Sequence, residues 1–242
     1  MLKKFSSHPT RKEAIKEGFT LVELLIVLTI LAILGVATVL ILNPAEILKK
    51  SRDTQRISDL NAVKSAIALY ASTVSTPYLG GAASDATCVG GSGTDTLYVS
   101  LPTDVADPDG GAITDASYPG TFGDWGQTTE VNAGLTTGSG WIPVNLDATT
   151  GGAAISAFPA DPNHECDASC LASVTNAALM YRYACNYNAA ASKPTTFEID
   201  AALESSYYTT EPNDIRKQDG GNNPLLLEVG TNLTLLPATD TF

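Results

Sequence analysis

One acidic side chain lies inside a long apolar run. Residues 19–42 read FTLVELLIVLTILAILGVATVLIL, and Glu23 is the only ionisable side chain among these 24 residues. A carboxylate costs roughly 2.5–3.5 kcal/mol at the centre of a membrane, so an acid at such a place usually has a partner. Two interpretations stay open. Either the acid is tolerated near a helix N-terminus, where the macrodipole favours negative charge, or it has a functional role that the surrounding junction, beginning one helical turn earlier at Phe19, must identify.

Four cysteines offer a second kind of chemistry, and they are Cys88, Cys166, Cys170 and Cys185. They follow the apolar run and, on the orientation derived below, lie outside the cytoplasm, where disulfides persist. Three pairings are open. We expect a bridge from the Cys166–Cys170 loop to Cys185; alternatively, Cys88 joins the middle of the chain to its C-terminal part. His164 with the last three cysteines could instead bind zinc, but the even count and the lack of a CxxC pattern favour disulfides.

Acid-rich turns are the remaining candidates for a metal site. They occur at residues 104–110 and 213–222, and the second holds Asp214 and Asp219. Oxygen-rich loops can bind calcium, but neither segment has the EF-hand pattern, and Asp and Gly are also common turn residues. We therefore predict no metal and no cofactor, with calcium at Asp214 and Asp219 as the alternative.

Catalytic patterns are missing from the sequence. The two histidines are His8 and His164, and no HExxH, GxSxG or P-loop motif is present. The spacings that a zinc hydrolase, a serine hydrolase or a nucleotide-binding enzyme needs are therefore lacking. We predict that the protein is not an enzyme.

The apolar run predicts a membrane-spanning helix. At ~1.5 Å per residue, 24 residues extend ~36 Å, which exceeds a hydrocarbon core of ~30 Å. Residues 1–18 carry five basic and two acidic residues. Because Lys and Arg stay on the cytoplasmic side, this end is predicted to be cytoplasmic and everything after residue 42 exported.

The exported part is acidic. The whole chain has a net charge of −12, and residues 71–242 carry 4 basic and 20 acidic residues, or −16. Such a surface repels phosphate, so we expect this part to bind no nucleic acid. With 44% apolar residues in the chain, about 170 residues suffice for one core.

A second helix is predicted to continue the first over residues 43–74. Its apolar residues recur at spacings of three and four, as one stripe of an amphipathic helix. Pro44 removes a backbone hydrogen bond and can kink the helix, and Gly35 is the other weak point. The stripe consists of Ile57, Leu60, Val63, Ile67, Tyr70 and Val74.

Beyond this helix the sequence changes character twice. Residues 75–160 are rich in Gly, Thr, Asp, Ser and Pro, with apolar islands at 97–101 and 141–146, and read as loops with short strands. Residues 161–242 are more regular. Segments 179–185 and 196–203 predict a hairpin, and 225–229 a further strand.

The junction Lys16-Glu17-Gly18-Phe19-Thr20-Leu21-Val22-Glu23 closely resembles the class III signal of type IV pilins and type II secretion pseudopilins. The resemblance implies that residues 1–18 are a leader, that a prepilin peptidase cuts between Gly18 and Phe19, and that the new Phe19 amine is methylated. Glu23, the fifth residue of the product, would then pair with that amine in a neighbouring subunit.

The resemblance also implies the fold class, an α+β pilin-like fold. A long N-terminal helix, half transmembrane (19–42) and half amphipathic (43–74), would pack on a C-terminal antiparallel sheet head with a large loop-rich insert (75–160). The segment 51–60 is similar to major pseudopilins. Its Arg52, Asp53 and Arg56 are predicted to contact other subunits, although mixed charges on a helix are more often solvated. Major pseudopilins as a group also have a calcium site near the C-terminus.

Filament assembly is the function that the resemblance implies. The chain would form a homo-oligomeric helical filament in the periplasm or at the cell surface, after passing through the membrane, a prepilin peptidase, an assembly platform protein and an assembly ATPase. The 51–60 segment favours a secretion pseudopilin, whereas the 242-residue length and the insert favour a type IV pilus or a tip subunit. The alternatives are an uncleaved, single-pass anchored binding module and, third, an anchored hydrolase.

Overall fold

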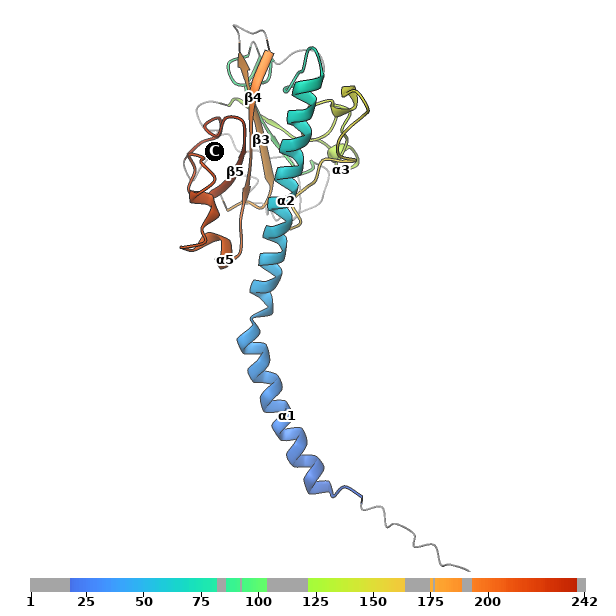
Figure 1. Cartoon of the computed structure of the whole chain (residues 1–242), viewed down its shortest axis with the longest axis vertical. Helices are drawn as coiled ribbons and strands as arrows, with labels where there is room; N and C mark the ends of the chain where they lie inside the picture. Colours follow the sequence, from blue (N-terminus) through green and yellow to red (C-terminus); the bar gives the residue numbers. More distant parts are fainter. Residues whose placement is uncertain are drawn as a thin grey trace, which may run out of the picture. The chain divides into compact units, whose positions relative to one another are not determined.

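The computed structural model describes residues 18–81, 86–91, 93–103, 122–163, 175, 177–188 and 193–238. The chain divides into two compact units, residues 1–44 and 45–242. The first contains helix α1, Leu21–Leu42 (Figure 1). The large apolar side chains described on α1 are 48–82% exposed. α1 alone supplies 22 residues, enough to cross a membrane by length and composition.

Helix α1 and the following helix are separated by one residue. α1 ends at Asn43, which takes the left-handed conformation with φ 40°, and α2 spans Pro44–Thr73. Proline suits the first position of a helix, where its missing N–H leaves no hydrogen bond unmade. The predicted weak point at Pro44 is thus a helix boundary, whereas Gly35 lies inside α1.

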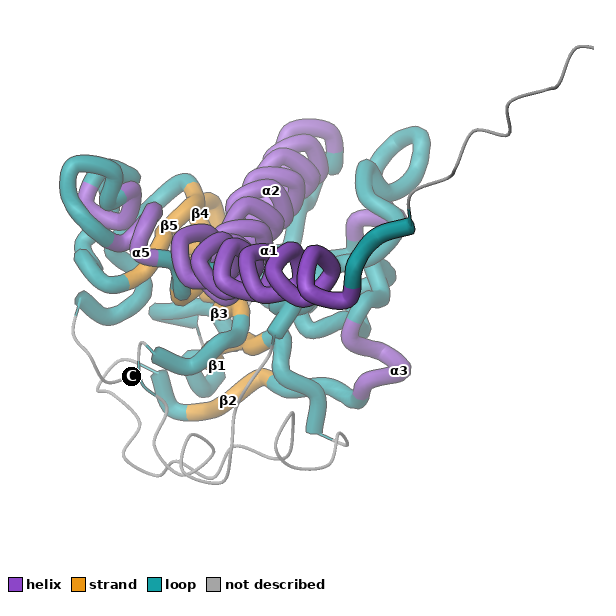
Figure 2. Tube along the Cα trace, turned by 90° about the horizontal axis from the view of Figure 1, so that it is seen from below, coloured by secondary structure: helices purple, strands orange, loops and turns teal. Residues whose placement is uncertain are grey.

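Helix α2 packs on one face of the sheet through the predicted stripe. Leu60, Val63, Ile67 and Tyr70 are buried, and the flanking Ile57 and Val74 are partly buried against the same core. This core also contains apolar side chains of strands β3, β4 and β5, which lie beside α2 in both views (Figures 1 and 2). The amphipathic prediction for this helix is confirmed.

The sheet has five strands in the order β2-β1-β3-β4-β5. β1 and β2 pair in parallel, and all other neighbours are antiparallel. The predicted hairpin is β3–β4, and the predicted strand near residue 226 is β5, so the α+β class is confirmed. The strands are β1 Thr96–Val99, β2 Asp124–Gly126, β3 Tyr181–Asn188, β4 Lys193–Ala202 and β5 Leu226–Gly230.

The apolar island at residues 141–146 is a buried loop and not a strand of the sheet. Trp141 is 1% exposed, and its indole Nε1 donates to the carbonyl of Pro159. Residues 141–146 make one isolated bridge, between Asn145 and Thr137, and lead into a short 3₁₀ helix. Burial of apolar side chains therefore did not require pairing with the sheet. The remaining short helices are α3 Glu130–Ala133, η1 Leu146–Ala148, α5 Ser206–Thr209 and η2 Ile215–Lys217.

The disulfide joins Cys88 to Cys185 across a sequence separation of 97 residues. The expected bridge from the Cys166–Cys170 loop to Cys185 was therefore wrong, and the alternative with Cys88 is the one formed. Val89 N donates to Cys185 O, and Tyr187 N donates to Val89 O, so the segment around Cys88 lies along β3. This pairing brings the two cysteine Cα atoms to 4.8 Å.

The sheet face opposite α2 buries charged side chains as well as apolar ones. Arg182 of β3 forms an ion pair with Asp200 of β4, and both are buried. Glu198 accepts hydrogen bonds from the backbone N–H groups of Leu235 and Leu236, which binds the C-terminal segment to the sheet. Alternating apolar and acidic residues, as in β4, are typical of a strand with one solvent-exposed face. Here both faces of β4 are buried.

The buried carboxyl groups of Glu198 and Glu228 lie close to each other on this face. The pKa of Glu198 is raised to about 10. Burial is the main cause, and the neighbouring Glu228 carboxyl group adds to it. Burial also raises the pKa of Glu228 and of Asp200. Two adjacent buried carboxyl groups cannot both ionise at low cost.

We predict that the head loses stability as pH rises. The pKa of Glu198 is about 10 in the folded chain, against an ordinary value of 4.5, so folding binds a proton that the unfolded chain has released. The contribution of Glu198 to the free energy of unfolding is complete below the ordinary pKa of 4.5. It declines as the pH rises toward about 10, by up to about 1.4 kcal/mol per pH unit. Denaturant unfolding of the full chain in detergent and EDTA, followed across this range, measures it.

A matched pair of variants isolates the carboxyl pair. Glu198→Gln keeps an acceptor for the C-terminal segment but cannot ionise, so the pH slope should flatten. Glu130→Gln, at an exposed position of α3, should leave the slope unchanged. Equal slopes in the parent and in Glu198→Gln would contradict the raised pKa of Glu198.

Candidate assembly site

The residues before α1 leave the predicted cleavage point open. Gly18, Phe19 and Thr20 lie outside the helix, and the Phe19 side chain is 86% exposed. A Cβ atom added at Gly18 would meet no atom within 4 Å. A peptidase must bind its substrate in an extended form, because helical hydrogen bonds hide the backbone. The Gly18–Phe19 bond lies outside the helix and meets this requirement.

Glu23 is bound within its own chain by Thr20. Its Oε2 accepts a hydrogen bond from Thr20 N at 2.8 Å and another from Thr20 Oγ1 at 2.7 Å. In return, Glu23 N donates to Thr20 Oγ1 at 3.2 Å. This is a capping box, in which Thr20 is the N-cap of α1. The carboxylate therefore lies at the positive end of the helix dipole, as one of the two interpretations of the sequence requires.

The capping box leaves room for the other interpretation. Among the described residues, both bonds that Glu23 accepts use Oε2. A cation could therefore bind Oε1 while the cap stays intact. Thr20 was missed in the sequence, although Thr20-x-x-Glu23 is itself the capping-box pattern.

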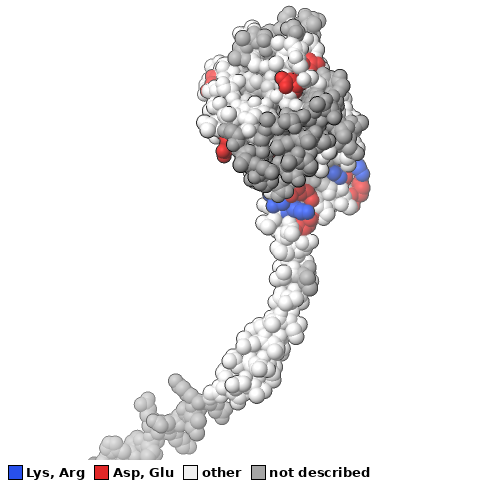
Figure 3. Space-filling view, turned by 180° about the vertical axis from the view of Figure 1, so that it is seen from behind, with Lys and Arg blue, Asp and Glu red and all other residues white. Residues whose placement is uncertain are grey.

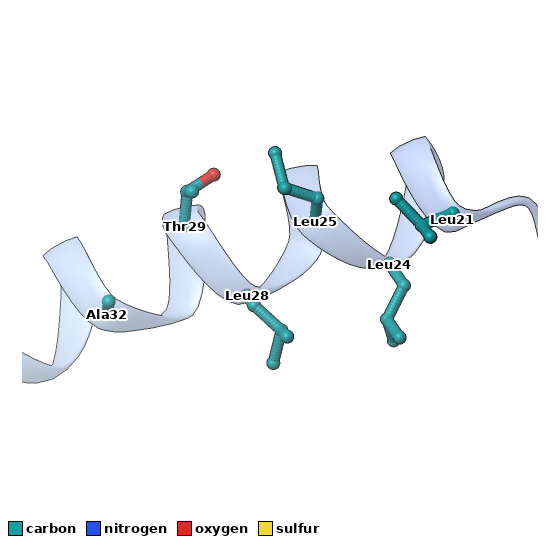
Figure 4. A pocket seen from close by; sticks show the side chains of 6 residues that line it. All are labelled: Leu21, Leu24, Leu25, Leu28, Thr29 and Ala32. Carbon is teal, nitrogen blue, oxygen red and sulfur yellow. The ribbon is translucent and has the colours of Figure 1, made fainter.

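The apolar surface of α1 contains a shallow groove just after Glu23. Figure 4 shows Leu25 and Thr29 pointing to one side of the helix and Leu24 and Leu28 to the other. Rows of side chains spaced by three and four residues are the ridges that a second helix packs between. The groove is lined by Leu21, Leu24, Leu25, Leu28, Thr29 and Ala32.

Arg56 anchors α2 inside the head through three carboxylates. Its Nε and Nη2 bind the two oxygens of Asp161, and its Nη1 binds Asp53 and Glu204, all at 2.7 Å. The Arg56 side chain is fully buried. Burial alone would lower the pKa of Arg56, but the carboxylates, Asp161 first, raise it above its ordinary value. The guanidinium is therefore charged at every relevant pH.

Asp53 and Arg52 hold the chain that leaves β4. Asp53 Oδ2 accepts from Ser205 N at 2.7 Å and from Ser205 Oγ at 2.6 Å, and Oδ1 accepts from Glu204 N at 3.0 Å. Arg52 donates twice to Glu204, at 2.7 and 2.8 Å. Burial acts to raise the pKa of Glu204, but the bonds from Arg52 and Arg56 outweigh it and lower the pKa.

The predicted subunit contacts of Asp53 and Arg56 need correction. Both are 0% exposed inside a single chain, so they are neither solvated nor within reach of another subunit. Arg52 is partly exposed but bound to Glu204. The sequence showed the charges on α2 but not their partners Asp161 and Glu204, because these lie 105 and 148 residues from Arg56.

The calcium candidates are bound by protein donors. Both oxygens of Asp214 accept from Arg216 at 2.9 Å, which lowers the pKa of Asp214. Asp219 accepts from the N–H groups of Gly221 and Glu228. In the described ranges no three His, Cys, Asp or Glu residues converge on a point that could hold a metal. Calcium binding stays a prediction without a defined ligand set.

The alternative zinc set is not formed as predicted, because Cys185 is in the disulfide with Cys88. His164, Cys166 and Cys170 lie outside the described residues, as do residues 104–110 and most of the leader. The described residues therefore define two separate features: the Gly18–Glu23 junction with the apolar surface of α1 in the first unit, and the Arg56 cluster in the second.

Comparison with known proteins supports the class that this geometry suggests. Residues 15–39 match the family described as Prokaryotic N-terminal methylation motif. The match covers the junction, Glu23 and most of α1, and it supports a class III signal peptide of the type IV pilin-like family. No curated protein and no solved structure matches the chain significantly.

The match and the fold together support a pilin-like precursor. The motif is the prepilin peptidase cleavage site of pilins, which implies processing and filament assembly. With the apolar helix, it indicates membrane anchoring with an exported head. It also indicates a structural protein and not an enzyme.

We predict that Arg56→Ala strongly destabilises the head. Removing the guanidinium takes away the cation that Asp53 and Asp161 share in a buried site, while Glu204 keeps Arg52; breaking a buried pair in this way typically costs about 3–5 kcal/mol. Denaturant unfolding of the full chain in detergent measures the loss. Lys64→Ala, on the same helix and only half-buried, is the matched control and should stay within about 0.5 kcal/mol of the parent. Similar losses in both variants would contradict the role of the cluster.

Proposed function

We propose that the chain is the precursor of a structural subunit, a pilin or pseudopilin, of a type IV pilus or type II secretion-like filament. A prepilin peptidase cuts between Gly18 and Phe19 and methylates the new Phe19 amine. An assembly platform protein and an assembly ATPase then move the subunit from the membrane into a homo-oligomeric filament. The observation that carries this proposal is the methylation motif at residues 15–39.

The chemistry of assembly is charge pairing in an apolar bundle. Cleavage creates a cation at Phe19, and Glu23 of a neighbouring copy supplies the counter-charge. At ~4 Å and an effective dielectric constant of ~20, such a pair attracts by about 4 kcal/mol before desolvation is subtracted. Because an unpaired charge in the bundle is costly, this pair sets the stagger between neighbouring α1 helices. The apolar groove of α1 supports close packing of those helices.

The geometry of the capping box supports this exchange. Thr20 binds Oε2 of Glu23 before assembly, so the carboxylate enters the membrane with two hydrogen bonds. The incoming amine binds Oε1, and the cap does not have to break. Thr20 therefore lowers the cost of Glu23 in the membrane without competing with the neighbour.

A second candidate function is an uncleaved, membrane-anchored binding module exposed outside the cytoplasm. Two observations favour it. Residues 45–242 form a compact unit with its own core, and Glu23 finds its hydrogen-bond partner inside its own chain. In this case α1 would be an anchor only.

The mass of the intact protein extracted from membranes separates the two functions. We expect the mass of residues 19–242 with one added methyl group, because the junction fits prepilin processing. Changing Gly18 to a bulky residue should preserve the full-length mass, which serves as the control. Mature protein that retains Met1 to Gly18 would support the anchored module.

We predict that Glu23→Ala permits cleavage but impairs incorporation into filaments. The variant removes the counter-charge while the Gly18–Phe19 bond stays unchanged, so processed subunit should accumulate in the membrane. Thr38→Ala is the matched control, since Thr38 does not line the groove and its described hydrogen bonds are local, to the carbonyls of Leu34 and Gly35. The assay is the ratio of sheared filament to membrane-bound subunit. A parental ratio in Glu23→Ala would refute the pairing.

A further inference from the structure

The first turns of α2 expose large apolar side chains close to the end of the membrane span. Ile47 is 55% exposed and Leu48 is 60% exposed, and they follow Leu42, the last residue of α1, by five and six residues. With α2 helical from Pro44, the backbone of Leu48 lies within ~15 Å of that end along the chain. One headgroup layer is roughly 5–7.5 Å thick, so this part of α2 follows the span at the depth of that layer or just beyond it.

Helix α5 brings two tyrosines to the same part of α2. Ser206 donates its Oγ to Glu46 at 2.7 Å and its N–H to the same oxygen. Lys50 Nζ lies 3.2 Å from the centre of the Tyr207 ring. Tyr208 contacts Thr54 through its hydroxyl, at 3.3 Å, and its ring packs edge-on against that of Tyr207. Figure 1 shows α5 at the end of the head where α2 begins to contact it.

We call this region the basal surface, made of Ile47, Leu48, Lys49, Lys50, Tyr207 and Tyr208. Tyr207 remains 46% exposed although its ring contacts Lys50. Tyrosines and lysines with apolar stems beside exposed aliphatic side chains are the composition of the membrane–water interface. Two acids lie in this region. Glu46 is bound by Ser206 and lies near Lys49. Glu204, which lines a pocket together with Lys49, is bound by Arg52 and Arg56.

The charge distribution of the head singles out the same end. Residues 71–242 carry −16, whereas the basal surface contributes two adjacent lysines. On the face drawn in Figure 3, the described Lys and Arg side chains gather at the end of the head where α2 emerges, with Asp and Glu side chains beside them. Anionic headgroups attract lysines there and repel the rest of the head.

We propose that the basal surface docks on the phospholipid headgroup layer of the membrane that α1 spans, with a preference for anionic phospholipids. The tyrosines and Ile47 and Leu48 enter the interface, and the lysines bind phosphate. Docking keeps the apolar residues at the start of α2 out of water. The proposal requires α1 in a bilayer but not cleavage at Gly18. Its test can therefore fail or succeed independently of the test of filament assembly.

Photocrosslinking of the full chain tests the proposal. The chain, with p-benzoylphenylalanine in place of Tyr207, is placed in nanodiscs of phosphatidylcholine and phosphatidylglycerol, irradiated and analysed by mass spectrometry. We expect phospholipid adducts enriched in phosphatidylglycerol relative to its share of the bilayer. The same probe at Val131 of α3, which is 86% exposed, should give none. Lys49→Gln with Lys50→Gln should abolish the enrichment.

Three results would overturn the proposal. They are no lipid adduct at position 207, an adduct with the mass of a second copy of the chain, and lipid adducts without phosphatidylglycerol enrichment. An unchanged melting temperature of the labelled protein shows that the head is folded. Should the probe at 207 unfold the head, the same probe at Tyr208 repeats the test.

Discussion

The structure depends on keeping the surface of α1 out of water. Its described large apolar side chains are about half exposed or more, and no other described residue from 18 to 44 buries them. Such a helix is stable in lipid or in a bundle of its own copies, because both remove apolar surface from water. Glu23 is the only ionisable residue in the apolar run. Thr20 of the same chain satisfies its hydrogen-bonding needs through the capping box. In the proposed function, the subunit can therefore reside in a membrane before assembly, and its Glu23 carboxylate can still bind the amine of a neighbouring subunit.

The head is held to α2 in two chemically different ways. The apolar stripe of α2 packs on the sheet, but apolar contacts alone tolerate small shifts along a helix. The buried cluster around Arg56 does not, since moving α2 by one turn would separate Arg56 from Asp161 and Glu204, and Asp53 from Ser205. We infer that the cluster fixes the register of α2, a role that buried ionic groups play in some other proteins. A subunit that is pulled through its N-terminal helix would need such a fixed attachment.

Local patterns predicted the elements well. The length of the apolar run predicted α1, the spacing from Ile57 to Tyr70 predicted the buried face of α2, and alternation predicted β3 and β4. Each of these signals lies within a few turns or one strand. The Gly18–Phe19 junction was recognisable for the same reason, since its whole motif spans fewer than ten residues.

Features that depend on distant partners could not be predicted. Arg56 is buried because Asp161 and Glu204 meet it in space, and Cys88 pairs with Cys185 because residues 86–91 lie along β3. The alternation in β4 is typical of a strand in which Glu198 faces solvent, but the distant C-terminal segment covers Glu198. β2, only three residues long, and the unpaired loop at Trp141 also follow from packing that no local spacing encodes.

The most direct test of the account is the contact between Phe19 and Glu23 in the filament itself. Filaments grown from a mixture of chains labelled with ¹⁵N and chains labelled with ¹³C allow solid-state NMR to detect contacts between copies only. The account predicts a dipolar coupling between the Phe19 amine nitrogen of one chain and the Glu23 carboxylate carbon of another. Filaments that lack this coupling, while neighbouring α1 side chains show theirs, would contradict it.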